Sequence, residues 1–109
     1  MRFWPALSGA LLIAAIAYGQ TNVPKGGFVP DSVTAVKIAE AALIPVYGKK
    51  VIESEEPFDA NLKGDIWTVS GTLHCSDGKG GTTTHCVGGV AVVKISKTNG
   101  RILSMTHSK

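Results

Sequence analysis

The chain has 109 residues, of which 44% are hydrophobic and 17% charged, and its formal net charge is +3 at pH 7. This length fits one small domain. The lysines and arginines are scattered along the sequence, so we expect no nucleic-acid partner. A mildly positive balance favours solubility and predicts no other particular partner.

Residues 1–19 have the pattern of a cleavable secretory signal peptide. A basic residue follows the initiator methionine, residues 6–17 are mostly apolar, and Ala17 and Gly19 are the small residues that signal peptidase reads. We therefore expect cleavage before Gln20 and export to an oxidising compartment. No stable membrane anchor should remain, because the apolar run is shorter than the ~20 residues of a bilayer span. An uncleaved anchor is the alternative.

A flexible arm at residues 20–29 and then a helix are expected next. Asp31 or Ser32 provides the N-cap of the helix. Pro45 should end the helix near Leu43 or Ile44, because the residue before a proline is pushed out of the helical region. Apolar residues recur every three to four positions, with Lys37 and Glu40 pointing away. The apolar face consists of Val33, Val36, Ile38, Ala39, Ala42 and Leu43.

The rest of the chain is predicted as sheet. Lys49–Ile52 is a possible short strand, and Glu53–Pro57 is a charged loop whose neighbours Phe58 and Leu62 pack onto the core. Three longer strands follow, and in the first of them Trp67 and Val69 share the buried face. These strands are Ile66–Leu73, Val87–Ser96 and Ile102–Thr106, with a hairpin connection at Ser76–Thr84 and a type I′ turn at Thr98–Arg101.

The element order predicts an α+β fold for the single domain at residues 30–109. One N-terminal helix covers the apolar face of a curved antiparallel sheet of three to four strands, as in cystatin-like folds.

Two cysteines follow two histidines, in the pairs His74–Cys75 and His85–Cys86. In an exported protein we expect a disulfide between the cysteines, which would contribute about 3 kcal/mol in the chain-entropy model. A zinc site formed by all four side chains is one alternative. Strand geometry argues against it, because neighbouring residues point to opposite faces. Free thiols are the other alternative.

The polar loop held by this disulfide is the first candidate for a contact surface, because a pre-ordered loop loses less entropy on binding. A stapled hairpin without a binding role is the alternative. The expected contact residues are Ser76, Asp77, Lys79, Thr83 and His85, followed by Glu55 and Glu56 of the charged loop.

No sequence pattern predicts catalysis, a metal or a cofactor. Paired carboxylates could act as acid and base only if one of them were buried, and we expect a solvated loop instead. His107 is expected to be an isolated surface histidine. The acidic residues considered are Glu53, Glu55, Glu56, Asp59 and Asp65.

Several segments together resemble a known family: Phe28–Asp31, Ala35 with Ile38–Ala41, Pro45–Gly48, Pro57–Phe58, Asp65–Leu73, Gly88–Gly89 and Lys97–Leu103. They are similar to bacterial immunity proteins with a nuclear-transport-factor-2-like fold, which are encoded beside polymorphic or type VI secreted toxins. The likeness covers residues 28–104. Larger members of this fold carry several helices around a deep pocket, whereas this chain has one clear helix, so no small-molecule site is expected.

The resemblance implies a function. The chain would bind a cognate toxin and block its active site, and export would place it in the periplasm against a toxin that attacks peptidoglycan. Exposed strand edges could also form a homodimer. The alternatives are a periplasmic binding module or protease inhibitor of cystatin-like shape, and a small enzyme with a polar pocket.

Overall fold

The computed structural model describes residues 22–84 and 88–108. Within these ranges two helices precede six strands. The proposed cleavage site before Gln20 lies outside them, as do His85 and Cys86, so the signal peptide and the disulfide stay predictions. The helices are α2 (Ser32–Tyr47) and α3 (Lys49–Ser54), and the strands are β1 (Asp59–Lys63), β2 (Ile66–Ser70), β3 (Cys75–Ser76), β4 (Thr82–Thr83), β5 (Ala91–Ser96) and β6 (Ile102–His107).

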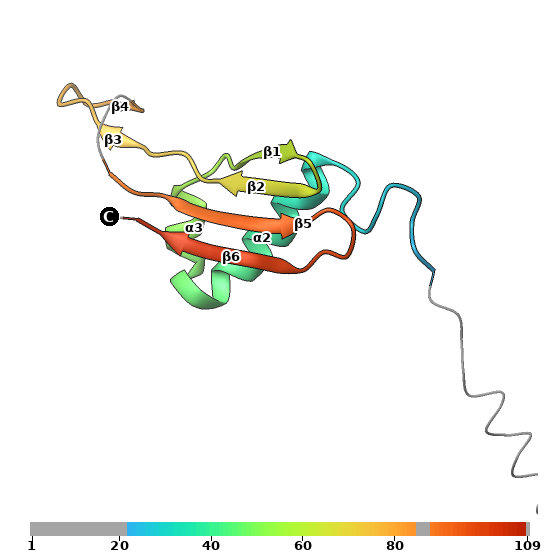
Figure 1. The fold of residues 1–109 in the computed structure, drawn as a ribbon. Helices are drawn as coiled ribbons and strands as arrows, with labels where there is room; N and C mark the ends of the chain where they lie inside the picture. Colours follow the sequence, from blue (N-terminus) through green and yellow to red (C-terminus); the bar gives the residue numbers. More distant parts are fainter. Residues whose placement is uncertain (1–21, 85–87, 109) are drawn as a thin grey trace, which may run out of the picture.

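Four strands form one antiparallel sheet in the order β1-β2-β5-β6, and both helices lie on one of its faces (Figure 1). β3 and β4 form a separate hairpin that projects from the end of the sheet. The α+β class, with one main helix on an antiparallel sheet of four strands, is thereby confirmed. No helix in the described part of the chain is long and apolar enough to cross a membrane.

α2 begins where the sequence predicts, because the carboxylate of Asp31 accepts a hydrogen bond from the backbone N–H of Thr34 at 2.8 Å. Its buried positions are Ala35, Ala39 and Leu43, one turn apart. The predicted apolar face was wrong at Val33, which is 62% exposed. The two small alanines let the helix lie close to the sheet. The buried face is therefore centred on Ala35 and Ala39, and Val33 lies outside it.

The end of α2 was also predicted wrongly, since the helix continues through Pro45 to Tyr47. In the last turn a proline removes little more than its own N–H bond, and the N–H of Gly48 still closes the helix on the carbonyl of Ile44 at 2.8 Å. Gly48 has φ 96°, which favours glycine and lets the chain turn into α3.

Two elements between α2 and β2 differ from their prediction. Lys49–Ile52 is part of helix α3 and not a strand, because Ile52 alone is buried there and its N–H bonds to the carbonyl of Gly48.

β1 was not predicted as a strand; it pairs with β2 across a tight turn in which Gly64 has φ 62°. Exposed positions dominate β1, so its sequence carries no clear alternation.

The core lies between α2 and the sheet and is centred on Trp67, Val69, Val93 and Ile95, all 7% exposed or less. The predicted facing of Trp67 and Val69 is confirmed. Two of the three predicted strands are shorter than expected, since β2 ends at Ser70 and regular pairing in β5 begins at Ala91. The third, β6, extends one residue beyond its predicted end, to His107. β5 and β6 are joined by the five residues 97–101, in place of the two-residue type I′ turn expected, and the N–H of Ser96 donates to the carbonyl of Arg101 at 2.9 Å.

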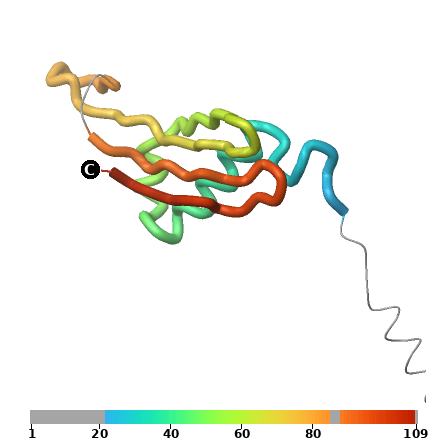
Figure 2. The backbone as a smooth tube through the Cα atoms, viewed as in Figure 1, coloured from blue at the N-terminus to red at the C-terminus, as the bar shows by residue number. Residues whose placement is uncertain are grey.

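The arm before α2 is packed against the domain over its last residues. The N–H groups of Phe28 and Val29 donate to the carbonyls of Thr98 and Lys97, at 3.1 and 3.0 Å. Trp67 donates its indole N–H to the carbonyl of Val29 at 2.8 Å. Figure 2 shows this arm beside the turn between β5 and β6. The prediction of a flexible arm is therefore wrong at its C-terminal end. The partners that hold Phe28 and Val29 are far away in sequence, so no local pattern indicates them.

Candidate protein-binding surface

The β3–β4 hairpin stands clear of the sheet and presents polar side chains (Figure 1). Its register pairs Cys75 with Thr83 and Ser76 with Thr82. Ser76, Asp77 and Lys79 are exposed, and Thr83 is half-buried. The structure thus brings four of the predicted contact residues together on one hairpin.

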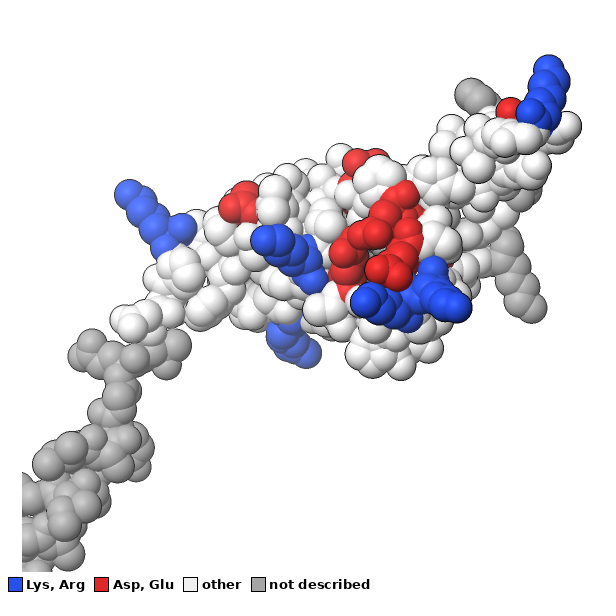
Figure 3. Space-filling view, turned by 180° about the vertical axis from the view of Figure 1, so that it is seen from behind, with Lys and Arg blue, Asp and Glu red and all other residues white. Residues whose placement is uncertain are grey.

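The tip of the hairpin is ordered by its own side chains. Oδ1 of Asp77 accepts hydrogen bonds from the backbone N–H groups of Lys79 at 2.7 Å and Gly81 at 3.0 Å. The hydroxyl of Ser76 accepts from the N–H of Gly78 at 3.2 Å. Such short-range bonds fix a loop locally. Asp77 therefore shapes the tip, and a basic side chain stands at its end (Figure 3).

The base of the hairpin is held by a buried carboxylate. Glu55 is 7% exposed; its Oε1 accepts from the N–H of Ala91 at 2.7 Å, and its Oε2 lies 2.8 Å from Nε2 of His107. Gly71 donates to the carbonyl of Ala91 at 3.0 Å, so Glu55 binds the point where β2 and β5 diverge into the hairpin. The prediction of a solvated loop was wrong for Glu55, which is unavailable to a partner.

His107 is half-buried and pairs with Glu55, contrary to the prediction of an isolated surface histidine. Its Nδ1 lies 2.9 Å from the carbonyl of Ser108, and its ring lies 5.2 Å from that of Tyr47. Both partners of the imidazole nitrogens are acceptors, so the arrangement suits the doubly protonated ring. The hydrogen bond to Glu55 accordingly raises the pKa of His107, against the opposing effect of burial.

Exposed Glu56 belongs to the same end of the molecule as the hairpin. Its carbonyl lies 2.8 Å from Nε2 of His74, and the N–H of Thr72 donates to the carbonyl of Glu55 at 2.7 Å. The hydroxyl of Thr72 donates to the carbonyl of Pro57. These bonds tie the acidic segment to the strand that leads into the hairpin, so the second predicted contact region lies beside the first.

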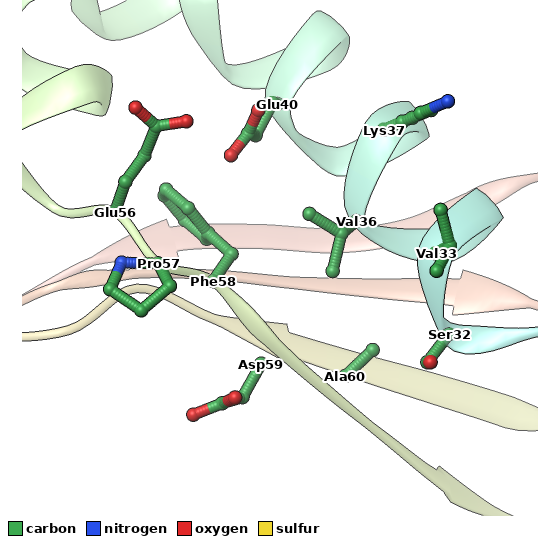
Figure 4. A pocket seen from close by; sticks show the side chains of 10 residues that line it. All are labelled: Ser32, Val33, Val36, Lys37, Glu40, Glu56, Pro57, Phe58, Asp59 and Ala60. Carbon is green, nitrogen blue, oxygen red and sulfur yellow. The ribbon is translucent and has the colours of Figure 1, made fainter.

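A groove of about 730 Å³ lies between α2 and β1, and we refer to it as the α2–β1 groove. Its walls are mainly apolar, and Figure 4 shows the side chains of Glu40 and Glu56 reaching toward each other above the ring of Phe58. The lining residues are Ser32, Val33, Val36, Lys37, Glu40, Glu56, Pro57, Phe58, Asp59 and Ala60.

Acidic side chains gather on this face of the molecule, with basic side chains beside them (Figure 3). Partial burial, followed by the charge and hydrogen bonding of Glu56 and the charge of Glu53, raises the pKa of Glu40. Glu40 was predicted to point away from the domain and was missed as a site residue. The signal that could have found it is helical spacing, since Val33, Val36 and Glu40 are three and four residues apart.

The ionisable side chains that line the α2–β1 groove are those of Lys37, Glu40, Glu56 and Asp59. No group of three or more histidine, cysteine, aspartate or glutamate side chains within residues 22–84 and 88–108 could hold a metal ion. Two adjacent carboxylates, one with a raised pKa, resemble a general acid and its partner as much as a cation-binding pair.

The fold and this surface define a small α+β domain with a projecting hairpin and an apolar groove that carries acidic side chains at one end. Comparison with known proteins gives it a family: residues 34–109 match the family of NTF2 fold immunity proteins. The chain therefore belongs to that family, and the resemblance stated from the sequence is confirmed.

Two curated relatives come from Escherichia coli (strain K12). The chain is 31% identical to the uncharacterized protein YhhH over 81 residues, which cover 74% of this chain and 58% of YhhH. It is 30% identical to the uncharacterized protein YbbC over 81 residues, covering 74% of this chain and 60% of YbbC. The chain thus spans about three fifths of the length of these relatives. No solved structure matches it significantly.

Proposed function

We propose that this chain is a periplasmic immunity protein that binds a cognate secreted toxin directed at the cell wall and blocks its active site. The observation that carries the proposal is the family match over residues 34–109. The signal-peptide pattern of residues 1–19 supports the location. Inhibition by occupancy requires a stable surface and no catalytic group, so we assign no enzymatic activity.

The β3–β4 hairpin is the part of the surface best suited to enter a cleft in the toxin. It projects from the body, its tip is fixed by Asp77, and its base is fixed by Glu55. A segment ordered before binding loses less conformational entropy in the complex. Ser76, Lys79 and Thr83 then supply the polar contacts.

The direct test uses a secreted hydrolase encoded beside this chain. The purified mature domain should bind that hydrolase and abolish its hydrolysis of peptidoglycan at equimolar ratio. Lys79→Glu should weaken binding about tenfold, since a charge at an interface is reversed. Lys63→Glu is the matched control, because Lys63 is an exposed lysine at the end of β1. Full hydrolysis in the presence of excess protein would refute the proposal.

A further inference from the structure

The α2–β1 groove has apolar walls and two carboxylates, a combination that suits a long side chain with a positively charged end. Val36, Phe58 and Ala60 form apolar walls, and the carboxylates of Glu40 and Glu56 lie at one end. Lys37 also lines the groove, but its ammonium end lies away from both carboxylates in Figure 4. An apolar channel that ends in two carboxylates matches a long aliphatic side chain with a cationic head.

Glu40 and Glu56 interact with each other and have no ion-pair partner among the described residues. The ion pair within those ranges joins Glu55 to His107. Charges of the same sign that are held close together and partly desolvated repel each other. A guanidinium group placed between them would remove this repulsion and could bond to both, because its donors form a planar fork.

The position of the groove relates it to the hairpin. Glu56 lines the groove, and its carbonyl lies 2.8 Å from the side chain of His74 on the strand that enters the hairpin. A protein that receives the hairpin therefore passes close to the acidic end of the groove.

We propose that the α2–β1 groove binds an arginine side chain of the toxin, with its aliphatic part against Val36 and Phe58 and its guanidinium between Glu40 and Glu56. The inference rests on the proposed function, since the toxin supplies the side chain. In the proposed complex, Glu40 and Glu56 bind the arginine of the toxin, and the β3–β4 hairpin enters the cleft of the toxin.

The groove is tested first without any toxin, by NMR titration of the mature domain with N-acetyl-arginine amide. Saturable shifts should appear at Val36, Phe58 and Glu40, and N-acetyl-citrulline amide, which has the same shape without the charge, should bind at least fivefold more weakly. The double variant Glu40→Gln, Glu56→Gln should lose about tenfold in affinity for the arginine probe. Asp65→Asn is the control, because it removes one exposed acid outside the groove.

Equal affinity for arginine and citrulline, or unchanged binding by the double variant, would overturn the groove proposal. Glu56→Gln alone serves as a second variant at an exposed position, and a thermal melt verifies that both variants fold.

The toxin experiment separates this inference from the proposed function. If wild type inhibits the adjacent hydrolase and the double variant inhibits it with equal affinity, the function stands and the arginine site in the interface is refuted. If the arginine probe binds but the hydrolase is not inhibited, the proposed function fails and the toxin is refuted as the source of the side chain. Weakening of both the probe and the hydrolase by the double variant supports the inference.

Discussion

The tip and the base of the β3–β4 hairpin are each held by a carboxylate, but the two carboxylates bond to partners at very different separations along the sequence. At the tip, Asp77 bonds to N–H groups two and four residues ahead in the chain. At the base, Glu55 bonds to Ala91 and His107, which are 36 and 52 residues away. Local bonds make a loop that forms independently of the fold, whereas distant bonds make a junction that exists only when the sheet is assembled.

The difference assigns separate roles to the two regions. The tip is exposed and contributes little to global stability, so its sequence is free to change with the partner. The base is buried, and a change there leaves unsatisfied polar groups in the interior. Substitutions at the base should therefore lower stability more than toxin binding. Substitutions at the tip should lower toxin binding more than stability.

The largest effect is expected at the base, from Glu55→Ala. The substitution leaves the N–H of Ala91 and the ring of His107 without their acceptor, and it should lower the free energy of unfolding by about 3 kcal/mol. Urea denaturation measures the loss. Glu55→Gln retains an acceptor for Ala91 and should lose less. Equal stability of wild type and Glu55→Ala would show that the base is not held by this carboxylate.

Reduction of the predicted Cys75–Cys86 disulfide should lower the melting temperature. The chain-entropy model gives up to about 3 kcal/mol for a closed loop of this size. Melting curves with and without dithiothreitol measure the effect, and the double variant Cys75→Ser, Cys86→Ser should melt like the reduced protein. Identical curves in both conditions would mean that the disulfide is absent or contributes nothing.

Gly71→Ala should destabilise the same junction by about 2 kcal/mol. A Cβ atom at this position would lie 2.8 Å from Oε1 of Glu55 and 3.2 Å from the ring of Phe58, so the buried carboxylate must shift. The combination with Glu55→Gly makes the effect specific, because glycine removes both Oε1 and the Cβ of residue 55, which would lie 2.9 Å from the added methyl, and so should relieve most of its cost. Additive losses in the double variant would contradict a clash with Glu55.

The pH dependence of stability should report on the pair of Glu55 and His107. The pKa of His107 is raised above its ordinary value of 6.5 in the folded state. Its stabilising contribution is therefore complete below pH 6.5 and is lost as the pH rises through the folded-state pKa. The difference in unfolding free energy between wild type and His107→Gln should shrink from pH 6 to pH 8.5. A constant or growing difference would exclude a charged pair.

The smallest effect on stability is expected at the tip, from Asp77→Ala. Loss of two local hydrogen bonds on an exposed loop should lower the free energy of unfolding by less than about 1 kcal/mol. Toxin binding should fall much more, because the tip loses its fixed shape. A loss of stability as large as that of Glu55→Ala would remove the distinction between the two regions.

Much of the fold was predictable because it follows from local patterns. The N-cap at Asp31, the alternation of Trp67 and Val69, and the strand at Ile102 each depend on neighbours in sequence. The missed elements lack such a pattern. β1 is mostly exposed and is held by its pairing with β2, and α3 follows a turn made possible by Gly48. Propensity is weak for short elements, so tertiary contacts decided them.

The site was predictable to a similar extent. The sequence alone determined the polar hairpin and the exposed Glu56, because loops rich in glycine and polar residues remain at the surface. Only the tertiary structure separated Glu55 from Glu56, by burying the first against His107 and Ala91 and placing the second in the groove with Glu40. The physical reason is that charge and burial depend on neighbours in space, and here those neighbours come from helix α2 and from strands β5 and β6.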